Sequence, residues 1–525
     1  MATVVEIDRL PAFRNEPLTD FRDPDNARAM EASLERVRAE LGRSHSLLIG
    51  AREIDTDTHI NSVNPARPSE VVARFARADA EHARLALEEA TAAFDVWRRR
   101  PWQDRVEVVL RAAEVMRERK FDLAALMVYE VSKSWAEADA DIAELIDFAE
   151  YYAREAVRLA GPQRVQHIEG EEPEMRYIPL GVGTIISPWN FPAALAGGMT
   201  LAAIVTGNTV VLKPAESAPT IAYKFVRILL DDAGMPPGVV NLVTGPGRVV
   251  GEALVDSPRT RFVAFTGSKE VGLRIFERAS KTQPGQIWLK RTILEMGGKD
   301  AILVDETADL DAAAEGIVAS AFGFQGQKCS ACSRAIVVDD VYDRVLEKVV
   351  ERTKKLSLGD PSKPETHMGA VIDESAFRKI SEYINVGSKE GRVVAGGKTG
   401  DPAQGYFIPP TIIADVAPTA RVAQEEIFGP VLAFIRARDF DDALEIANST
   451  EFGLTGSLYS KDEQRLERAG EDFHVGNLYF NRKSTGAMVG VHPFGGFNMS
   501  GTDSKAGGPD YLLLFTQAKT ISRKV

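Results

Sequence analysis

Both cysteines of this 525-residue chain lie in one stretch, Gln325-Gly326-Gln327-Lys328-Cys329-Ser330-Ala331-Cys332. A second stretch a little upstream, Leu294-Glu295-Met296-Gly297-Gly298-Lys299, places a carboxylate beside a pair of glycines. A nucleophilic sulfur and a carboxylate that activates water are the two groups needed to oxidise a carbonyl through a covalent intermediate. We therefore take Cys329 as the candidate nucleophile and Glu295 as the candidate base.

The two cysteines have other interpretations. A free cysteine is usually a small buried hydrophobic residue, and two cysteines three residues apart are also typical of redox or metal pairs. The seven histidines show no ligand-like spacing, and two cysteines cannot fill a four-ligand zinc site, so we predict no metal. We expect Cys332 to lie one helical turn from Cys329 as a bystander. A reversible oxidative link between the two remains an open hypothesis, as does a thiol–disulfide protein.

Composition narrows the class of protein. A chain of 525 residues exceeds a single core, so two or three domains are expected. The net charge of −13 argues against nucleic acid as a general partner, and no apolar run approaches a membrane span. The first six residues lack a basic-then-apolar signal pattern, and two cysteines are too few for a disulfide framework. We therefore predict a cytoplasmic protein without a membrane partner.

The order of helical and strand patterns predicts the fold class. Helical patterns occupy residues 25–41, 80–99, 103–118 and 135–158, and we interpret their charged faces as solvated surface. Short β-branched runs then alternate with helical stretches at 218–233 and 248–256. The predicted strands are 182–188, 209–214, 239–243, 262–265, 301–304, 335–338 and 431–435. This alternation predicts two tandem, parallel, doubly wound α/β domains with a boundary near Glu295.

The strand ends before Glu295 carry residues suited to a dinucleotide. Lys213 follows one strand, with Glu216 three residues later, and Gly247 and Gly267 lie in turns after two further strands. Glycines at strand-to-helix turns allow backbone N–H groups to approach a pyrophosphate. The usual fingerprint of three spaced glycines is incomplete because position 250 is valine. Each turn alone also fits an ordinary turn with solvated charges, so the prediction rests on their succession.

Six motifs in order resemble those of the NAD(P)-dependent aldehyde dehydrogenase superfamily, from about residue 46 to the C-terminus. They are Ser187-Pro188-Trp189-Asn190-Phe191-Pro192, Lys213-Pro214-Ala215-Glu216, Phe265-Thr266-Gly267-Ser268, Leu294-Glu295-Met296-Gly297-Gly298-Lys299, Gly326-Gln327-Lys328-Cys329 and Glu425-Glu426-Ile427-Phe428-Gly429-Pro430. The resemblance implies the aldehyde dehydrogenase fold, in which a small β flap for oligomerisation accompanies the two tandem α/β domains. Taken singly, Asn190 could cap a helix and Glu426 could be a solvated charge.

The resemblance also implies the roles of the site residues. Cys329 attacks the aldehyde, and the Asn190 amide with the Cys329 backbone N–H stabilises the oxyanion. Hydride passes to the nicotinamide, and Glu295 activates the water that hydrolyses the thioester. The implied cofactor-binding residues are Ile186, Lys213, Glu216, Gly247, Gly267, Ser268, Glu426 and Phe428. A carboxylate at position 216 would chelate ribose hydroxyls, so we expect NAD, with NADP use left open.

Within the superfamily the chain resembles the Δ1-pyrroline-5-carboxylate dehydrogenase subfamily at residues 13–17, 322–331, 473–482 and 485–490. This implies oxidation of L-glutamate γ-semialdehyde to L-glutamate in proline degradation. Another semialdehyde or aliphatic aldehyde dehydrogenase is the alternative, and a non-catalytic relative is a further one. Ser330, Gly486 and Ala487 would bind the substrate carboxylate and Glu137 its ammonium group. Phe191 and Phe494 would enclose the aliphatic chain.

The implied domains are an extension (1–45), a cofactor-binding domain (46–163 and 181–294), a catalytic domain (295–500) and a flap (164–180 and 501–525). Residues 164–177 look like an exposed hairpin, with 517–525 as its partner strand. Such a ribbon invites pairing across a subunit interface, so we expect a homodimer or a higher homo-oligomer.

Overall fold

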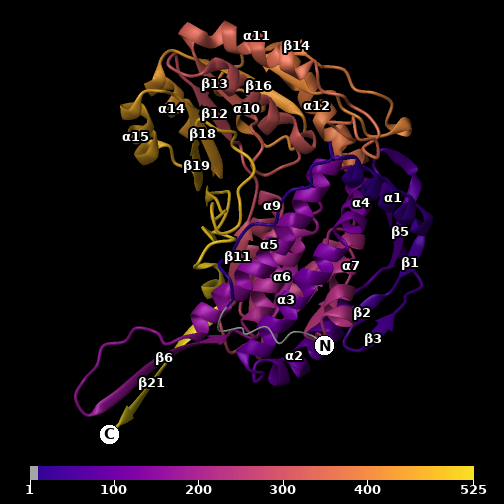
Figure 1. Cartoon of the computed structure of the whole chain (residues 1–525), viewed down its shortest axis with the longest axis vertical. Coiled ribbons are helices and arrows are strands. Elements are labelled where there is room, and N and C mark those ends of the chain that lie inside the picture. The colour runs from indigo at the N-terminus through magenta and orange to yellow at the C-terminus, as the bar shows by residue number, and fades with distance from the viewer. Residues whose placement is uncertain (1–9) are drawn as a thin grey trace.

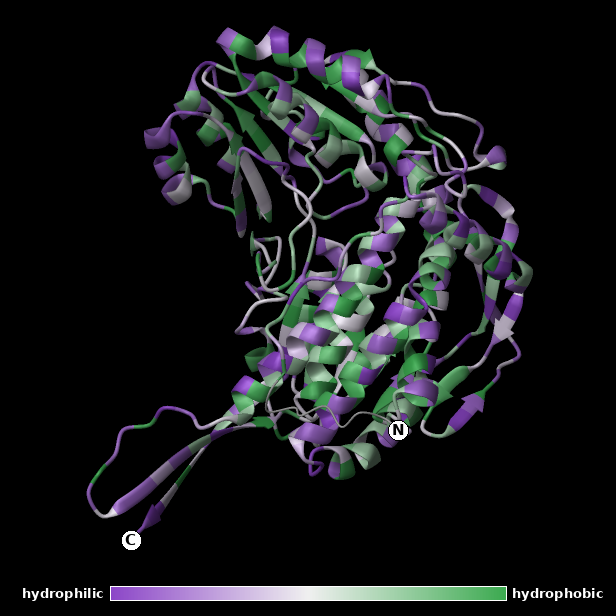
Figure 2. Cartoon of the chain, in the orientation of Figure 1, coloured by the Kyte–Doolittle hydropathy of each residue, from purple (hydrophilic) through white to green (hydrophobic). Residues whose placement is uncertain are grey.

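Two series of apolar, β-branched runs, one before Glu295 and one after it, form two seven-stranded sheets. The computed structural model describes residues 10–525 and places the second sheet above the first, with a two-stranded arm extending from the lower unit (Figure 1). Both sheets are coloured as hydrophobic in Figure 2, whereas the surface helices alternate between hydrophilic and hydrophobic residues. Strands that are buried on both faces account for these continuous apolar runs. The two α/β sheets expected from the sequence are present.

The first sheet has the strand order β11–β10–β7–β8–β9–β2–β3. The first five strands in this order are parallel to one another. Strand β2 pairs antiparallel with β9, and β3 pairs antiparallel with β2. The strands are β7 (Val182–Ile186), β8 (Thr209–Lys213), β9 (Val240–Leu242), β10 (Phe262–Thr266), β11 (Arg291–Glu295), β2 (Leu47–Ile49) and β3 (Arg52–Ile54). The four strands predicted here are confirmed, whereas β2, β3 and β11 had not been predicted.

The second sheet has the order β14–β15–β16–β13–β12–β18–β19, and only the β14–β15 pair is antiparallel. Its strands are β12 (Ala301–Val304), β13 (Arg334–Val338), β14 (Arg392–Ala395), β15 (Thr411–Ala414), β16 (Val431–Ala437), β18 (Thr455–Tyr459) and β19 (Asn477–Phe480). The chain thus leaves the first sheet after Glu295 and enters the second at Ala301. The domain boundaries proposed from the sequence remain a prediction.

Helices cover both sheets. The predicted helices appear as α1 (Pro24–Glu40), α2 (Ala80–Trp97), α3 (Trp102–Glu118), α5 (Trp135–Ala160), α7 (Pro219–Arg227) and α8 (Glu252–Asp256). A π-helical segment follows α7 at Ile228–Asp232, and another precedes α8 at Gly247–Gly251. The others are α4 (Lys120–Val131), α6 (Ala194–Val205), α9 (Lys269–Ser280), α10 (Leu310–Phe322), α11 (Tyr342–Thr353), α12 (Glu374–Glu390), α13 (Arg421–Gln424), α14 (Phe440–Asn448) and α15 (Glu463–Asp472). Within residues 10–525 no helix is both long and apolar enough to cross a membrane.

The prediction of a solvated charged face is wrong for α5. Asp139 and Asp147 on this helix are buried because the N-terminal extension covers them. Asp139 accepts hydrogen bonds from the backbone and hydroxyl of Thr19, and Asp147 accepts one from the Asn15 amide at 2.8 Å. The extension therefore packs against α5 through carboxylates that the sequence pattern marked as exposed.

The arm consists of β6 (Glu171–Pro179) and β21 (Thr516–Lys524), which pair antiparallel from Thr516–Pro179 to Lys524–Glu171. The predicted partnership with the C-terminal strand is thus confirmed. The prediction of a hairpin within residues 164–177 is wrong, because residues 164–170 form no strand. Smaller sheets comprise β1 (Arg43–His45), β5 (Arg67–Ala76) and β4 (His59–Asn64), and β17 (Phe452–Gly453) with β20 (Phe497–Asn498).

A buried ion pair fixes the relative positions of α5 and α6. Lys133 and Asp141 have fully buried side chains, and Nζ of Lys133 lies 2.8 Å from Oδ2 of Asp141. The other oxygen, Oδ1, accepts a hydrogen bond of 2.8 Å from the backbone N–H of Ala194, the first residue of α6. The Lys133 ammonium also lies 4.0 Å from the centroid of the Phe191 ring. The pair thus holds the segment that carries Asn190 and Phe191.

We predict that Lys133→Met destabilises the protein by about 3–5 kcal/mol, because it leaves the Asp141 carboxylate buried without its partner. A lowered thermal or urea unfolding midpoint is the measurement. Lys355→Met is the matched control, since Lys355 pairs with Glu351 on the surface and should shift the midpoint little. Equal midpoints for the two variants would contradict this role of the buried pair.

Candidate active site

A cavity of about 290 Å³ lies where the carboxyl ends of the first sheet face the second α/β unit. Ligands of open α/β sheets bind at such strand ends. The first unit contributes residues that follow β7, β10 and β11, and the second contributes Cys329 and residues near Glu426. The cavity is lined by Pro188, Trp189, Asn190, Thr266, Gly267, Ser268, Met296, Gly297, Cys329, Ile372, Asp373, Ser375, Ala376, Lys379, Glu426, Ile427 and Phe428.

Cys329 is presented by an irregular segment, residues 323–329, which we call the nucleophile loop. Phe324, Gln325 and Gly326 have φ values of 48°, 56° and 67°, so three successive residues adopt the left-handed conformation. This conformation is unfavourable for the two non-glycine residues and needs compensating contacts. A Cβ atom on Gly326 would lie 2.4 Å from the carbonyl oxygen of Gly429, which explains the glycine.

Two glutamine side chains supply these contacts. Nε2 of the buried Gln325 donates hydrogen bonds to the carbonyls of Ser132 at 3.0 Å and Ala370 at 2.9 Å. Oε1 of Gln327 accepts one from the backbone N–H of Ile372 at 2.9 Å. The sequence pattern singled out neither glutamine, because nothing in a single sequence shows which polar residues will be buried.

The same loop is bound to the first unit at two further points. The Asn190 amide donates to the carbonyl of Gln327 at 3.1 Å. Nζ of Lys328 lies 2.7 Å from Oε1 of Glu137 on α5. The two residues that flank Cys329 on its N-terminal side are thus tied to the other α/β unit.

The surroundings of Cys329 favour the protonated form of its thiol. Burial raises the pKa of this thiol well above its usual range, and the nearby carboxylates of Asp300, Glu295 and Glu426 raise it further. A thiolate is the reactive nucleophile, so attack requires a group that takes the thiol proton.

Cys332 lies apart from this chemistry. The expected helical spacing is wrong, because residues 328–331 form a turn and the chain then enters β13. Cys332 is 1% exposed, packs in the core of the second unit and contacts the carbonyl oxygen of Arg334 through Sγ at 3.4 Å. Burial raises the pKa of its thiol to about 12. An oxidative link between the two cysteines remains a hypothesis.

Glu295 is the last residue of β11. Its Oε1 accepts a hydrogen bond from the Ser504 hydroxyl, and its Oε2 is buried without a partner among residues 10–525. Burial raises the pKa of Glu295 to about 8, although the Ser504 hydrogen bond opposes this rise. The carboxyl group lies against Gly495 and Gly501, and Glu295 is not among the described residues that line the cavity. Its resting position is therefore beside the cavity.

The glycine pair after Glu295 lets the Glu426 carboxylate and the Cys329 carbonyl approach the backbone closely. A Cβ on Gly297 would lie 2.3 Å from Oε1 of Glu426, and one on Gly298 would lie 2.5 Å from the carbonyl oxygen of Cys329. The backbone N–H of Gly298 donates to Oε1 of Glu426 at 3.0 Å. Glu426 therefore points inward, and burial raises the pKa of its carboxyl group.

Several predicted cofactor residues lie at adjacent strand ends. Ile186 and Lys213 are register partners at the ends of β7 and β8. Lys213 is buried, its Nζ donates to the carbonyl of Pro214 at 3.0 Å, and burial lowers its pKa to about 8 despite Glu216. A Cβ on Gly247 would meet nothing within 4 Å, which leaves room beside this ammonium group. These residues fit a polar ligand that brings its own hydrogen-bond acceptors.

The remaining cofactor residues lie nearer to Cys329. Gly267 and Ser268 line the cavity, and Ser268 caps α9, where its hydroxyl accepts a hydrogen bond from the Val271 N–H. Phe428 has a φ of 60°, and its ring meets the Trp189 ring edge-on at 5.5 Å. Ile186, Lys213, Gly247, Gly267 and Ser268 thus lie at the carboxyl ends of neighbouring strands of the first sheet, and Phe428 reaches the same cavity from the second unit.

Several predicted substrate residues contact segments next to the nucleophile loop. The carbonyl of Ser330 accepts a hydrogen bond of 3.4 Å from the hydroxyl of Ser484, which is two residues before Gly486. Gly486 has a φ of 77°, a conformation that favours glycine. Phe191 and Phe324 meet edge-on at 6.2 Å. Phe494 exchanges backbone hydrogen bonds with Ala506 at 2.8 and 2.7 Å.

Glu137 is not a free acceptor, since Lys328 already occupies one of its oxygens. Burial alone would raise the pKa of Glu137, but the attraction of Lys328 and Lys133 lowers it. Glu137 is therefore ionised and acts on the nucleophile loop. The charge of Lys328 could have suggested an ion pair, but its partner 191 residues away could not be read from one sequence.

Residues 52–521 match the aldehyde dehydrogenase family. The chain belongs to this family. The expected resemblance and fold are thereby confirmed, and the two-sheet arrangement around Cys329 is that of a family member.

Individual relatives cover almost the whole length of this family member. The 1-pyrroline-5-carboxylate dehydrogenase of Geobacillus sp. (strain WCH70) is 58% identical over 510 residues, which are 97% of this chain and 99% of that protein. The structure of the R100A mutant of Thermus thermophilus 1-pyrroline-5-carboxylate dehydrogenase is 52% identical, with a TM-score of 0.96 over 98% of this chain and 100% of that one. A 1-pyrroline-5-carboxylate dehydrogenase from Thermus with bound NAD is 51% identical, with the same TM-score and coverage.

We predict that Ser504→Ala moves the rising limb of the kcat–pH profile to higher pH by about one unit. Ser504 donates to the ionised form of Glu295, so its loss raises the pKa of a base that acts only when deprotonated. Ser522→Ala is the control, because Ser522 makes the same kind of bond to Glu171 on the arm. A profile unchanged from wild type in Ser504→Ala would argue against Glu295 as the titrating base.

Proposed function

We propose that this protein oxidises L-glutamate γ-semialdehyde to L-glutamate with NAD, a step of proline degradation. The observation that carries the proposal is the convergence of Cys329, Asn190 and the segment 484–487 around one loop. The relatives described above carry the name 1-pyrroline-5-carboxylate dehydrogenase, and this chain is similar to them over almost their whole length.

The proposed first step is attack of Cys329 sulfur on the aldehyde carbon. The carbonyl oxygen becomes an oxyanion and needs donors aimed at it. The Asn190 amide has two N–H groups, of which one donates to Gln327, so the second can serve the oxyanion with the Cys329 backbone N–H. The bond to Gln327 keeps this amide in position beside the nucleophile.

The last step is hydrolysis of the thioester formed on Cys329. We propose that Glu295 takes a proton from the attacking water, which requires its carboxyl group to be ionised and to turn from Ser504 toward the cavity. The pKa of about 8 suits a base that exchanges protons near neutral pH. The same carboxylate can accept the proton that the half-buried Cys329 thiol loses in the first step, and it must pass that proton to solvent before it takes one from the attacking water.

NAD, when bound, accepts the hydride released from the substrate carbon. Lys213 and Glu216 would hold its adenosine ribose, Gly267 and Ser268 its pyrophosphate, and Glu426 its nicotinamide ribose. Lys213 supports this assignment because, within residues 10–525, its ammonium group donates to one acceptor and keeps unused donors. Ile186, Gly247 and Phe428 would line the same groove. Use of NADP and a cytoplasmic location remain predictions.

Recognition of the carboxylate of the substrate is assigned to Ser330, Gly486 and Ala487. Backbone N–H groups and a hydroxyl bind an anion without placing a competing full charge beside the thiolate. The Ser484–Ser330 hydrogen bond supports the assignment, because it holds the segment with Gly486 against the residue that follows Cys329. Phe191 and Phe494 would pack on the carbon chain.

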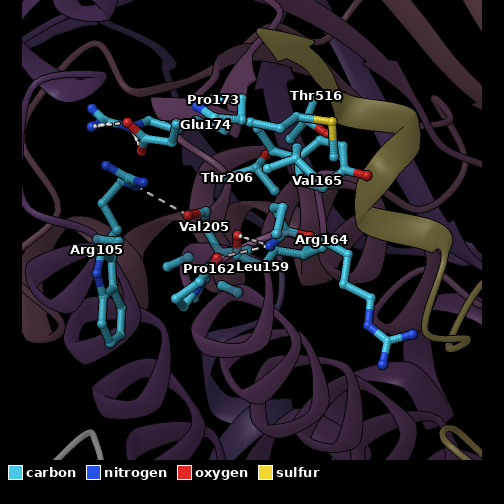
Figure 3. Close-up of a pocket in the computed structure, with 18 of the residues that line it drawn as sticks. Arg105, Leu159, Pro162, Arg164, Val165, Pro173, Glu174, Val205, Thr206 and Thr516 are labelled. Carbon is cyan, nitrogen blue, oxygen red and sulfur yellow. Dashed lines mark hydrogen bonds and ion pairs between the residues drawn. The ribbon is translucent and has the colours of Figure 1, made fainter. Parts of the chain in front are cut away.

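We further propose that the protein is a homodimer or a higher homo-oligomer that assembles through the arm. Ile521 on the arm is 37% exposed, and Ile168 and Val525, just outside its two strands, are 63% and 69% exposed. A cavity of about 680 Å³ lies where the arm leaves the first unit, lined by Arg105, Leu159, Val205 and Thr516 among others (Figure 3). A second copy would cover these groups, and deletion of residues 516–525 should reduce the mass measured by light scattering.

The experiment that tests the function is NAD reduction over a panel of aldehydes. We expect the highest kcat/KM for L-glutamate γ-semialdehyde and loss of activity in Cys329→Ala. An equal or higher kcat/KM for succinic semialdehyde or a plain aliphatic aldehyde would overturn the specific substrate while leaving the family chemistry intact.

A further inference from the structure

Glu144 is a half-buried carboxyl group on α5 that none of the roles above uses. It makes no hydrogen bond or ion pair within residues 10–525, unlike its neighbours Asp139, Asp141 and Asp147. An acidic side chain in a folded interior is normally paired. A half-buried carboxyl group without a partner is therefore a candidate for binding a cationic group from outside the chain.

The helix places Glu144 between two parts of the substrate site. At 100° per residue Glu144 lies within about 40° of Glu137 and Phe148 around the helix axis. Glu137, two turns before it, binds Lys328 beside Cys329. Phe148, one turn after it, packs against Gly507, which in turn contacts Val489 of the segment 485–490. Glu144 thus faces the space between the nucleophile loop and that segment.

The electrostatics agree with this position. Glu144 is one of the carboxylates that raise the pKa of the Cys329 thiol, so it lies within electrostatic range of the sulfur. Burial raises the pKa of Glu144 to about 8, and Asp141 and Asp147 add to the rise, whereas Lys133 and Lys328 oppose it. Burial therefore favours the neutral form of the Glu144 carboxyl group, and a cation bound beside it would favour the ionised form.

We propose that Glu144 accepts the α-ammonium group of the amino-acid aldehyde and so selects it over aldehydes that lack this group. The proposal rests on the proposed function and assigns to Glu144 the role that the family resemblance implied for Glu137. Glu137 then positions Lys328 and the nucleophile loop. The carboxylate end of the substrate meets Ser330, Gly486 and Ala487, and its ammonium group turns toward α5.

The test compares two product-like inhibitors, L-glutamate and glutarate, which differ only in the ammonium group. Wild type should bind L-glutamate more tightly than glutarate, measured as competitive inhibition against the aldehyde. Glu144→Gln should reduce this preference by about 10- to 100-fold, the range for a hydrogen bond to a charged group, with glutarate inhibition little changed. In the same variant KM for L-glutamate γ-semialdehyde should rise more than kcat falls, and KM for succinic semialdehyde should stay constant.

Glu137→Gln and Glu155→Gln are the comparison variants. Glu155 lies further along α5, paired with Arg158, and should leave all constants unchanged. Glu137→Gln should lower kcat for every aldehyde and keep the preference for L-glutamate. Retention of the full preference in Glu144→Gln, or its loss in Glu137→Gln alone, would overturn the inference. Wild-type inactivity on L-glutamate γ-semialdehyde would instead overturn the proposed function, so the two failures are distinguishable.

Discussion

The left-handed turn that precedes Cys329 is the constraint on which the site depends. Phe324, Gln325 and Gly326 would not hold this backbone by themselves, and the bonds from Gln325 to Ser132 and Ala370 compensate for it. The turn ends α10 abruptly and directs Cys329 out of the second unit toward the strand ends of the first. Asn190 and Glu137 then reach the same loop from the first unit. The nucleophile is thus built by one unit and positioned by the other.

This arrangement explains why the groups around the sulfur are so tightly packed. The glycine pair at 297 and 298 admits the Glu426 carboxylate on one side and the Cys329 carbonyl on the other. Several acidic groups surround the half-buried Cys329 thiol and favour its protonated form. Reactivity then depends on Glu295 as a proton acceptor, and the Ser504 hydroxyl and burial set its pKa in opposite directions. A site that buries an unpartnered carboxylate oxygen, such as Oε2 of Glu295, lowers the stability of the fold. The buried Lys133–Asp141 pair holds α5 and α6, the helices that support the site.

Much of the fold could be predicted from sequence because strand runs such as 209–213 and 262–266 have apolar centres and are followed at once by proline or glycine. Helix α4 is not evident from the sequence because it is buried around almost its whole circumference and has only a weak amphipathic period. The motif around Cys329 indicated the chemistry, but the partners of Gln325, Lys328 and Glu295 lie 45 to 209 residues away. Such long-range pairs follow from packing, which no local pattern in one sequence encodes. The burial of Asp139 and Asp147 was misjudged for the same reason.

The most direct measurement for the central claim is the steady-state and thiol-labelling kinetics of Gln325→Met, a substitution that keeps the bulk of the side chain and removes the two donors. Loss of these bonds should let the nucleophile loop shift, and a displacement of about 1 Å is enough to lower kcat by roughly 100-fold. We predict such a fall in kcat, a changed rate of Cys329 alkylation and an unchanged far-ultraviolet circular dichroism spectrum. A folded Gln325→Met variant with wild-type kcat and wild-type Cys329 reactivity would contradict the account, because the loop would then hold its geometry without the anchor.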